Sequence, residues 1–73
     1  MKTVYKFIYF TELKKMPGKW VCLNLKTADP LAFIEYYPAW RQHIAQFNDG
    51  CVFNCQCLDD ISDFLKQLNE KKK

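Results

Sequence analysis

The sequence has little of what enzymes and phosphate-binding proteins usually need, with two glycines, one histidine and one serine among 73 residues. A phosphate-binding loop needs several glycines close together, whereas Gly18 and Gly50 stand far apart. A nucleophile and base pair would need an orienting carboxylate beside His43, which instead falls at the margin of an apolar pattern. Ser62 falls in the first turn of an expected helix, where serine commonly bonds to the backbone. We therefore predict a protein that is not an enzyme and has no cofactor.

The chain has no excess of basic over acidic residues once the last three residues are set aside. Lysine and arginine total 11 against 8 acidic residues, and Lys71, Lys72 and Lys73 account for the whole net charge of +3. Arg41 is the single arginine. Because clustered lysine and arginine supply most of the affinity for duplex DNA, this balance argues against a duplex-binding protein. We predict one compact domain over residues 1–70 and a basic disordered tail over residues 71–73.

Long apolar runs are also missing. No stretch approaches the roughly 20 apolar residues that cross a bilayer. The apolar start is interrupted by Lys6 and Glu12 and is followed by no small-residue cleavage site, so we expect no signal peptide and no membrane partner. The expected location is the cytoplasm, with the four cysteines present as thiols.

Aromatic and β-branched residues are abundant in the first third of the chain and predict a hairpin. The segment 3–13 carries apolar side chains on both faces, which is typical of a central strand. Pro17-Gly18 suits the two middle positions of a type II turn. A second strand is expected over residues 20–25, with Val21, Leu23 and Leu25 on one face.

The rest of the chain predicts a helix, a strand and a second helix. Asp29-Pro30 resembles a helix start, and large apolar residues recur from Phe33 to Phe47 at spacings of four and three. Pro38 lies inside this pattern, so we expect a kinked or divided helix. Residues 51–57 alternate as an edge strand does. Asp59 then caps a helix with Ile61, Phe64, Leu65 and Leu68 on one stripe.

This order gives an α+β fold, β-β-α-β-α. We predict a three-stranded, mostly antiparallel sheet in the spatial order 2-1-3, packed with two helices. Two arrangements stay open. The helices cover opposite faces and the aromatic residues form the core, or both helices cover one face and leave an aromatic surface.

The second arrangement predicts the function. An exposed patch of several hundred Å² usually marks an interaction site, and tyrosine and tryptophan are favoured at interfaces. We therefore expect a non-enzymatic protein-binding module, of the kind that phages and mobile elements encode as inhibitors, docking on another protein or on itself as a homodimer. Its predicted binding residues are Tyr5, Phe7, Tyr9, Lys14, Lys15, Lys19 and Trp20.

Two other ligands fit parts of the sequence. Tyr5, Phe7 and Tyr9 at alternate positions could stack on the bases of single-stranded RNA, with lysines along the phosphates. Cys51, Cys55, Cys57 and His43 provide enough ligands for zinc. In an extended segment, however, Cys51 and Cys55 would lie roughly 13 Å apart, too far for one metal. We therefore expect thiols of the core.

Overall fold

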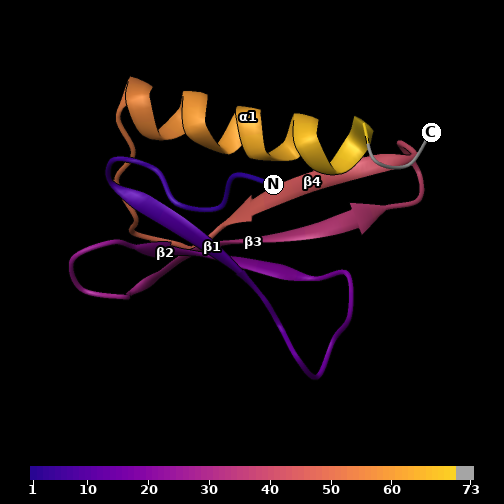
Figure 1. Ribbon diagram of the computed structural model, residues 1–73, viewed down its shortest axis with the longest axis horizontal. Helices are drawn as coiled ribbons and strands as arrows, with labels where there is room; N and C mark the ends of the chain where they lie inside the picture. The colour runs from indigo at the N-terminus through magenta and orange to yellow at the C-terminus, as the bar shows by residue number, and fades with distance from the viewer. Residues whose placement is uncertain (71–73) are drawn as a thin grey trace.

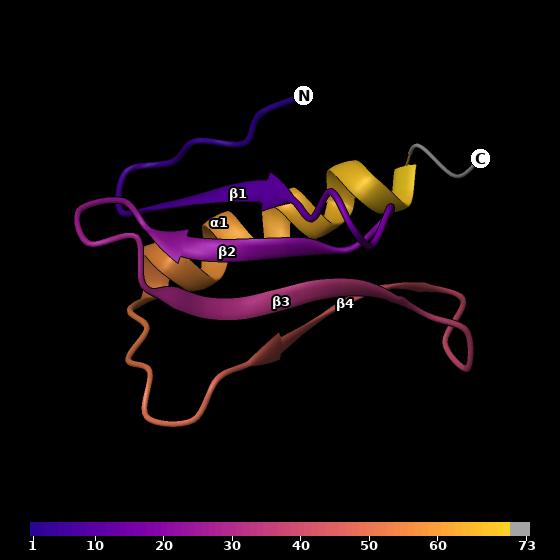
Figure 2. The same ribbon diagram turned by 90° about the horizontal axis from the view of Figure 1, so that it is seen from below.

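The computed structural model describes residues 1–70, which form a four-stranded antiparallel sheet with one helix on one face (Figure 1). The strands are neighbours in sequence order, so each pairs with the next through a hairpin. Figure 2 shows the opposite face of the sheet, which no helix within residues 1–70 covers. The elements are β1 (Ile8–Glu12), β2 (Trp20–Asn24), β3 (Pro30–Tyr37), β4 (Gln42–Phe47) and α1 (Cys55–Glu70). The predicted tail, 71–73, lies outside the described residues, and none of the described helical residues makes a segment long and apolar enough to cross a membrane.

The predicted three-stranded sheet with two helices is wrong, chiefly because residues 30–47 form the β3–β4 hairpin instead of a helix. Pro38 explains this difference. Its ring disfavours the helical conformation of the residue before it, so Tyr37 ends an extended strand. A turn follows, in which the N–H of Trp40 donates to the Tyr37 carbonyl at 3.1 Å and that of Arg41 donates to the Pro38 carbonyl at 3.2 Å. Arg41 completes the reversal with a φ of 54°.

The predicted edge strand over residues 51–57 is also wrong. Residues 48–54 form an irregular loop, and α1 begins at Cys55 instead of after Asp59. Asn54 is the cap that sets this start. Its side-chain Oδ1 accepts the N–H of Cys57 at 2.8 Å, and its carbonyl accepts the N–H of Leu58 at 3.1 Å. An asparagine in this position satisfies one of the amide groups that the first helical turn leaves unpaired.

Removing this cap should weaken the helix start. We expect Asn54→Ala to lower the free energy of unfolding by about 1 kcal/mol, measured by urea denaturation. Asp59→Ala is the matched control, because Asp59 is exposed and lies inside the helix, where it caps nothing. An equal loss in the two variants would contradict the assignment of the cap.

The predicted strand order 2-1-3 is contradicted as well, since β2 and β3 are the central strands. The segment predicted as one central strand, 3–13, instead divides into an N-terminal arm and β1. The N-terminal arm, residues 3–5, folds back along the outer edge of β1, where the N–H of Phe10 donates to the Thr3 carbonyl at 2.8 Å. The N–H of Tyr5 donates to the Ile8 carbonyl at 2.8 Å. The arm therefore gives β1 a covered edge without making it central.

The first hairpin and the apolar stripe of the last helix are confirmed. Gly18 has a φ of 86°, and the N–H of Lys19 donates to the Met16 carbonyl at 3.0 Å, as a type II turn with Pro17-Gly18 requires. From α1, the fully buried Phe64 stacks on Phe10 with ring centres 4.0 Å apart and makes a T-shaped contact with Trp20, with ring centres 5.1 Å apart. The core thus lies between α1 and one face of the sheet. Its buried members are Tyr5, Ile8, Phe10, Cys22, Ala32, Ile34, Cys57, Ile61, Phe64 and Leu68.

Candidate functional site

The aromatic residues predicted to form one binding surface lie in different places. Tyr5 is 7% exposed and belongs to the core, where its hydroxyl donates to Oδ2 of Asp63 at 2.8 Å. Trp20 packs against that core from the helix side of β2. Tyr9 alternates with the buried Ile8 and Phe10 and so faces the uncovered side of the sheet. Phe7, 42% exposed, precedes β1. The structure does not bring these four rings together.

Burial changes the chemistry of Tyr5. Removal from water, followed by the hydrogen bond and the negative charge of Asp63, raises the pKa of the Tyr5 hydroxyl above its ordinary value of 10.0. The side-chain amide of Gln67 donates to the same hydroxyl at 2.9 Å and lowers this pKa in part. Tyr5 therefore ties the N-terminal arm to α1 and is not a free stacking surface.

The three predicted binding lysines lie near the β1–β2 turn. Lys14 and Lys15 are exposed in the loop between β1 and β2. Lys19 extends over the uncovered face of the sheet, where its ammonium is 3.7 Å from Oε2 of Glu35 and 5.6 Å from the ring centre of Phe33. Lys19 thus lies on the uncovered face, and all three lysines belong to the β1–β2 hairpin and not to β4, which is the last strand across the sheet (Figure 2).

The uncovered face carries several apolar side chains, but they shield one another. Val21 is 7% exposed, and Tyr9, Leu23, Phe33 and Ile44 are half-buried even without a covering helix. The central part of this face is therefore an apolar surface whose side chains are partly shielded from solvent.

The candidate zinc ligands do not meet. Cys57 is buried in the core, Cys55 is exposed at the start of α1, and Cys51 lies in the preceding loop. His43 is held on β4, where its backbone N–H donates to Oδ1 of Asn69 at 2.6 Å. Within residues 1–70, no three histidine, cysteine or carboxylate side chains group in a way that could hold a metal ion.

The cysteines therefore divide between core and surface. The expectation of core thiols holds for Cys57 and for Cys22, which is fully buried beneath the helix. Burial raises the pKa of the Cys22 thiol to about 12. A thiol with so high a pKa is a poor nucleophile and a poor metal ligand at neutral pH. Cys51 and Cys55 lie outside that core.

The outer edge of β4 is different, because no described segment pairs with it. The N–H of Asn48 donates to the Leu31 carbonyl at 2.9 Å, which fixes the residues of β4 whose backbone groups point toward β3. By alternation, the N–H and C=O groups of Ala45 and Phe47 point away from β3. The β4 edge, defined by these two residues, is thus open to another strand, whereas the N-terminal arm covers the edge of β1.

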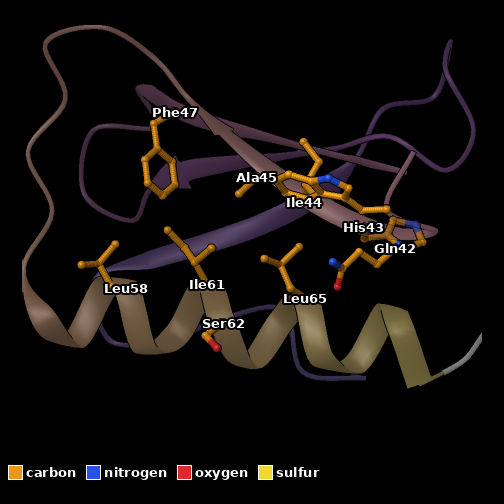
Figure 3. A pocket seen from close by; sticks show the side chains of 10 residues that line it. Gln42, His43, Ile44, Ala45, Phe47, Leu58, Ile61, Ser62 and Leu65 are labelled. Carbon is orange, nitrogen blue, oxygen red and sulfur yellow. The ribbon is translucent and has the colours of Figure 1, made fainter. Parts of the chain in front are cut away.

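An apolar groove of about 390 Å³ adjoins this edge, between β4 and α1. Figure 3 shows Leu58, Ile61 and Leu65 directed from the helix toward the strand, while strand and helix converge toward His43. Several of its side chains are well exposed, including Trp40 at 66%, Phe47 at 50% and Leu58 at 45%. The lining contains no lysine, arginine, aspartate or glutamate; it consists of Trp40, Gln42, His43, Ile44, Ala45, Phe47, Leu58, Ile61, Ser62 and Leu65.

Sequence reasoning missed this site because it placed β4 in a helix. One signal of an edge open to pairing was available. Gln42–Phe47 contains no lysine, arginine, aspartate, glutamate or proline, whereas protected edge strands commonly carry lysine, proline or a bulge. Comparison of the chain with protein-family models, curated protein sequences and solved structures gives no match.

Proposed function

We propose that this chain is a non-enzymatic protein-binding module that receives an extended segment of a partner protein along the β4 edge. The open edge of β4, next to an uncharged apolar groove, is the observation that carries this proposal. Binding here would block a surface of the partner, which is how small inhibitor proteins act.

Strand addition explains what each part of the site would do. The free N–H and C=O groups of Ala45 and Phe47 would hydrogen-bond to the backbone of the partner, which provides affinity without requiring a particular sequence. Alternate side chains of an added strand point to one face, so every second residue would enter the groove beside Leu58 and Leu65. Because the lining is mostly apolar and contains no lysine, arginine or carboxylate, we expect apolar side chains at those positions.

RNA fits this site less well than a peptide does. Single-stranded nucleic acids need cationic groups along the phosphates, and none of the residues that line the groove is lysine or arginine.

The four cysteines are free thiols, which supports a reducing location such as the cytoplasm.

Selection from a library of displayed random peptides tests the proposal. We expect the enriched peptides to share apolar residues at every second position, and Phe47→Asp to weaken their binding at least tenfold. The carboxylate would place an unpaired charge in an apolar groove and repel apolar side chains. Tyr9→Asp, on the uncovered face, is the control and should leave binding unchanged.

Two results would contradict strand addition at β4. One is the absence of any enriched pattern. The other is enrichment of peptides whose binding is lost in Tyr9→Asp but kept in Phe47→Asp, which would assign binding to the uncovered face. Retention of single-stranded RNA that falls with added salt and persists in Phe47→Asp would favour the nucleic-acid interpretation instead.

A further inference from the structure

We infer that the strand received at the β4 edge is the β4 strand of a second copy of this chain, so that two sheets join around a twofold axis. This inference rests on the proposed function, since it names the partner of the same edge. Four features of β4 support it: the hydrogen-bonding groups left free, the placement of charge, the sizes of neighbouring side chains, and the surface that pairing would cover.

The free backbone groups select one register. The N–H of His43 is already donated to Asn69, so the groups directed outward for a new strand belong to Ala45 and Phe47. If Ala45 of each copy pairs with Phe47 of the other, each pair exchanges two hydrogen bonds and all of these groups are satisfied. A register centred on Ala45 would instead set Phe47 opposite His43, whose N–H is taken. The twofold axis therefore passes between the two copies of Gln46.

The charges on either side of β4 favour an antiparallel copy. The strand Gln42–Phe47 is uncharged, with Arg41 before it and Asp49 two residues after it. Antiparallel pairing brings Arg41 of each copy to the end of the strand near Asp49 of the other. A parallel arrangement would place like charges side by side, which is unfavourable.

Side-chain sizes also match in this register. Ala45 and Phe47 both project into the groove on the helix side, so the small side chain of each copy would lie beside the large ring of the other. The ring of Phe47 already packs against Phe53, with centres 4.7 Å apart, and would be covered on its other side.

The area available is that of a small dimer interface. Stable interfaces bury at least about 600 Å² on each partner. An aromatic side chain carries roughly 150–250 Å², so Trp40 and Phe47, at 66% and 50% exposed, offer on the order of 200–250 Å² together. The exposed half of Leu58 and the edge of a six-residue strand must provide the remainder. We therefore expect a dimer that dissociates on dilution.

Light scattering on the full chain over a concentration series tests the pairing. The wild type should approach twice 8.7 kDa at high concentration, whereas Ala45→Pro should stay at 8.7 kDa because it lacks the N–H that the partner accepts. Proline is tolerated on the outer side of an edge strand, and circular dichroism would verify the fold of the variant. Equal masses for wild type and Ala45→Pro, whether monomeric or dimeric, would overturn the inference.

Cross-linking then tests the register. In a chain with Cys51→Ser and Cys55→Ser, Gln46→Cys should form a disulfide dimer on mild oxidation, because facing residues at the axis would have Cα atoms about 4.5 Å apart. Gln42→Cys, on the same strand and exposed like Gln46, should form at least tenfold less. Equal cross-linking by the two variants would overturn the proposed register.

The outcomes separate this inference from the proposed function. A wild type that stays monomeric while selected peptides bind in a Phe47-dependent way would disprove self-pairing and leave strand addition intact. A monomer without peptide binding would contradict both.

Discussion

Phe64→Ala is expected to remove a large part of the stability of the domain, lowering the free energy of unfolding by about 3–5 kcal/mol. A domain of this length usually has only about 4–11 kcal/mol in total. Phe64 is fully buried and stacks on Phe10 at an interplanar angle of 5°, with Trp20 against its edge. Its removal would leave a cavity where α1 meets β1 and β2, and the surrounding rings could fill it only in part. Urea denaturation followed by tryptophan fluorescence measures the loss.

Phe7→Ala is the matched control for that variant. The substitution removes the same atoms, but Phe7 is 42% exposed and lies outside the buried core. We expect a loss below about 1 kcal/mol, as for most surface positions. Similar losses in the two variants would contradict the placement of the core between the helix and the sheet.

The sequence was sufficient to predict those parts of the fold that depend on local chemistry. Pro17-Gly18 specified its turn because proline fixes one φ and glycine allows the positive φ that follows. The stripe of Ile61, Phe64 and Leu68 has spacings of three and four, which a strand cannot place on one face. Each feature has one structural solution, so local pattern and final structure agree.

The β3–β4 hairpin was mistaken for a helix because part of its pattern fits both structures. A spacing of four, as from Phe33 to Tyr37, keeps two residues on one face of a helix and also on one face of a strand. Only the odd steps distinguish the two structures. In the hairpin, Trp40 lies in the turn, and Phe47 faces the helix while Ile44 faces the uncovered side. Pro38 is the residue that favours strands here, because proline disfavours the helical conformation of the residue before it.

The candidate site could not be derived from local patterns, because it depends on which strand ends the sheet. The N-terminal arm covers the outer edge of β1 through hydrogen bonds from Phe10 and Tyr5. No local sequence pattern at either residue predicts that pairing. The free groups of Ala45 and Phe47 become evident only when the register with β3 is known. The aromatic binding surface of Tyr5, Phe7, Tyr9 and Trp20 stays an untested prediction. The aromatic side chains that line the groove are Trp40 and Phe47, whereas Tyr5 and Trp20 pack in or against the core.

The second large effect is expected at alkaline pH, where stability should fall steeply above pH 9. Burial raises the pKa of Cys22 from 9.0 to about 12 and raises that of Tyr5 above its ordinary 10.0. Both groups therefore keep their protons in the folded state at a pH where the unfolded chain releases them. The unfolded state binds fewer protons, so the free energy of unfolding decreases by about 1.4 kcal/mol per pH unit for each group, above pH 9 for Cys22 and above pH 10 for Tyr5. By pH 11 the two losses together reach about 4 kcal/mol.

Urea denaturation between pH 8 and pH 11 measures this slope, and two substitutions assign it. Cys22→Ala and Tyr5→Phe each lower stability at pH 8, since one leaves a small cavity and the other loses the hydrogen bond to Asp63. Each should nevertheless flatten the decline with pH, because the group that titrates only in the unfolded chain is gone. Cys55→Ala, which removes an exposed thiol, is the control for the loss of a cysteine outside the core. If the free energy of unfolding of a variant carrying both Cys22→Ala and Tyr5→Phe declines with pH as steeply as that of the wild type, then neither the buried thiol nor the buried phenol couples folding to pH.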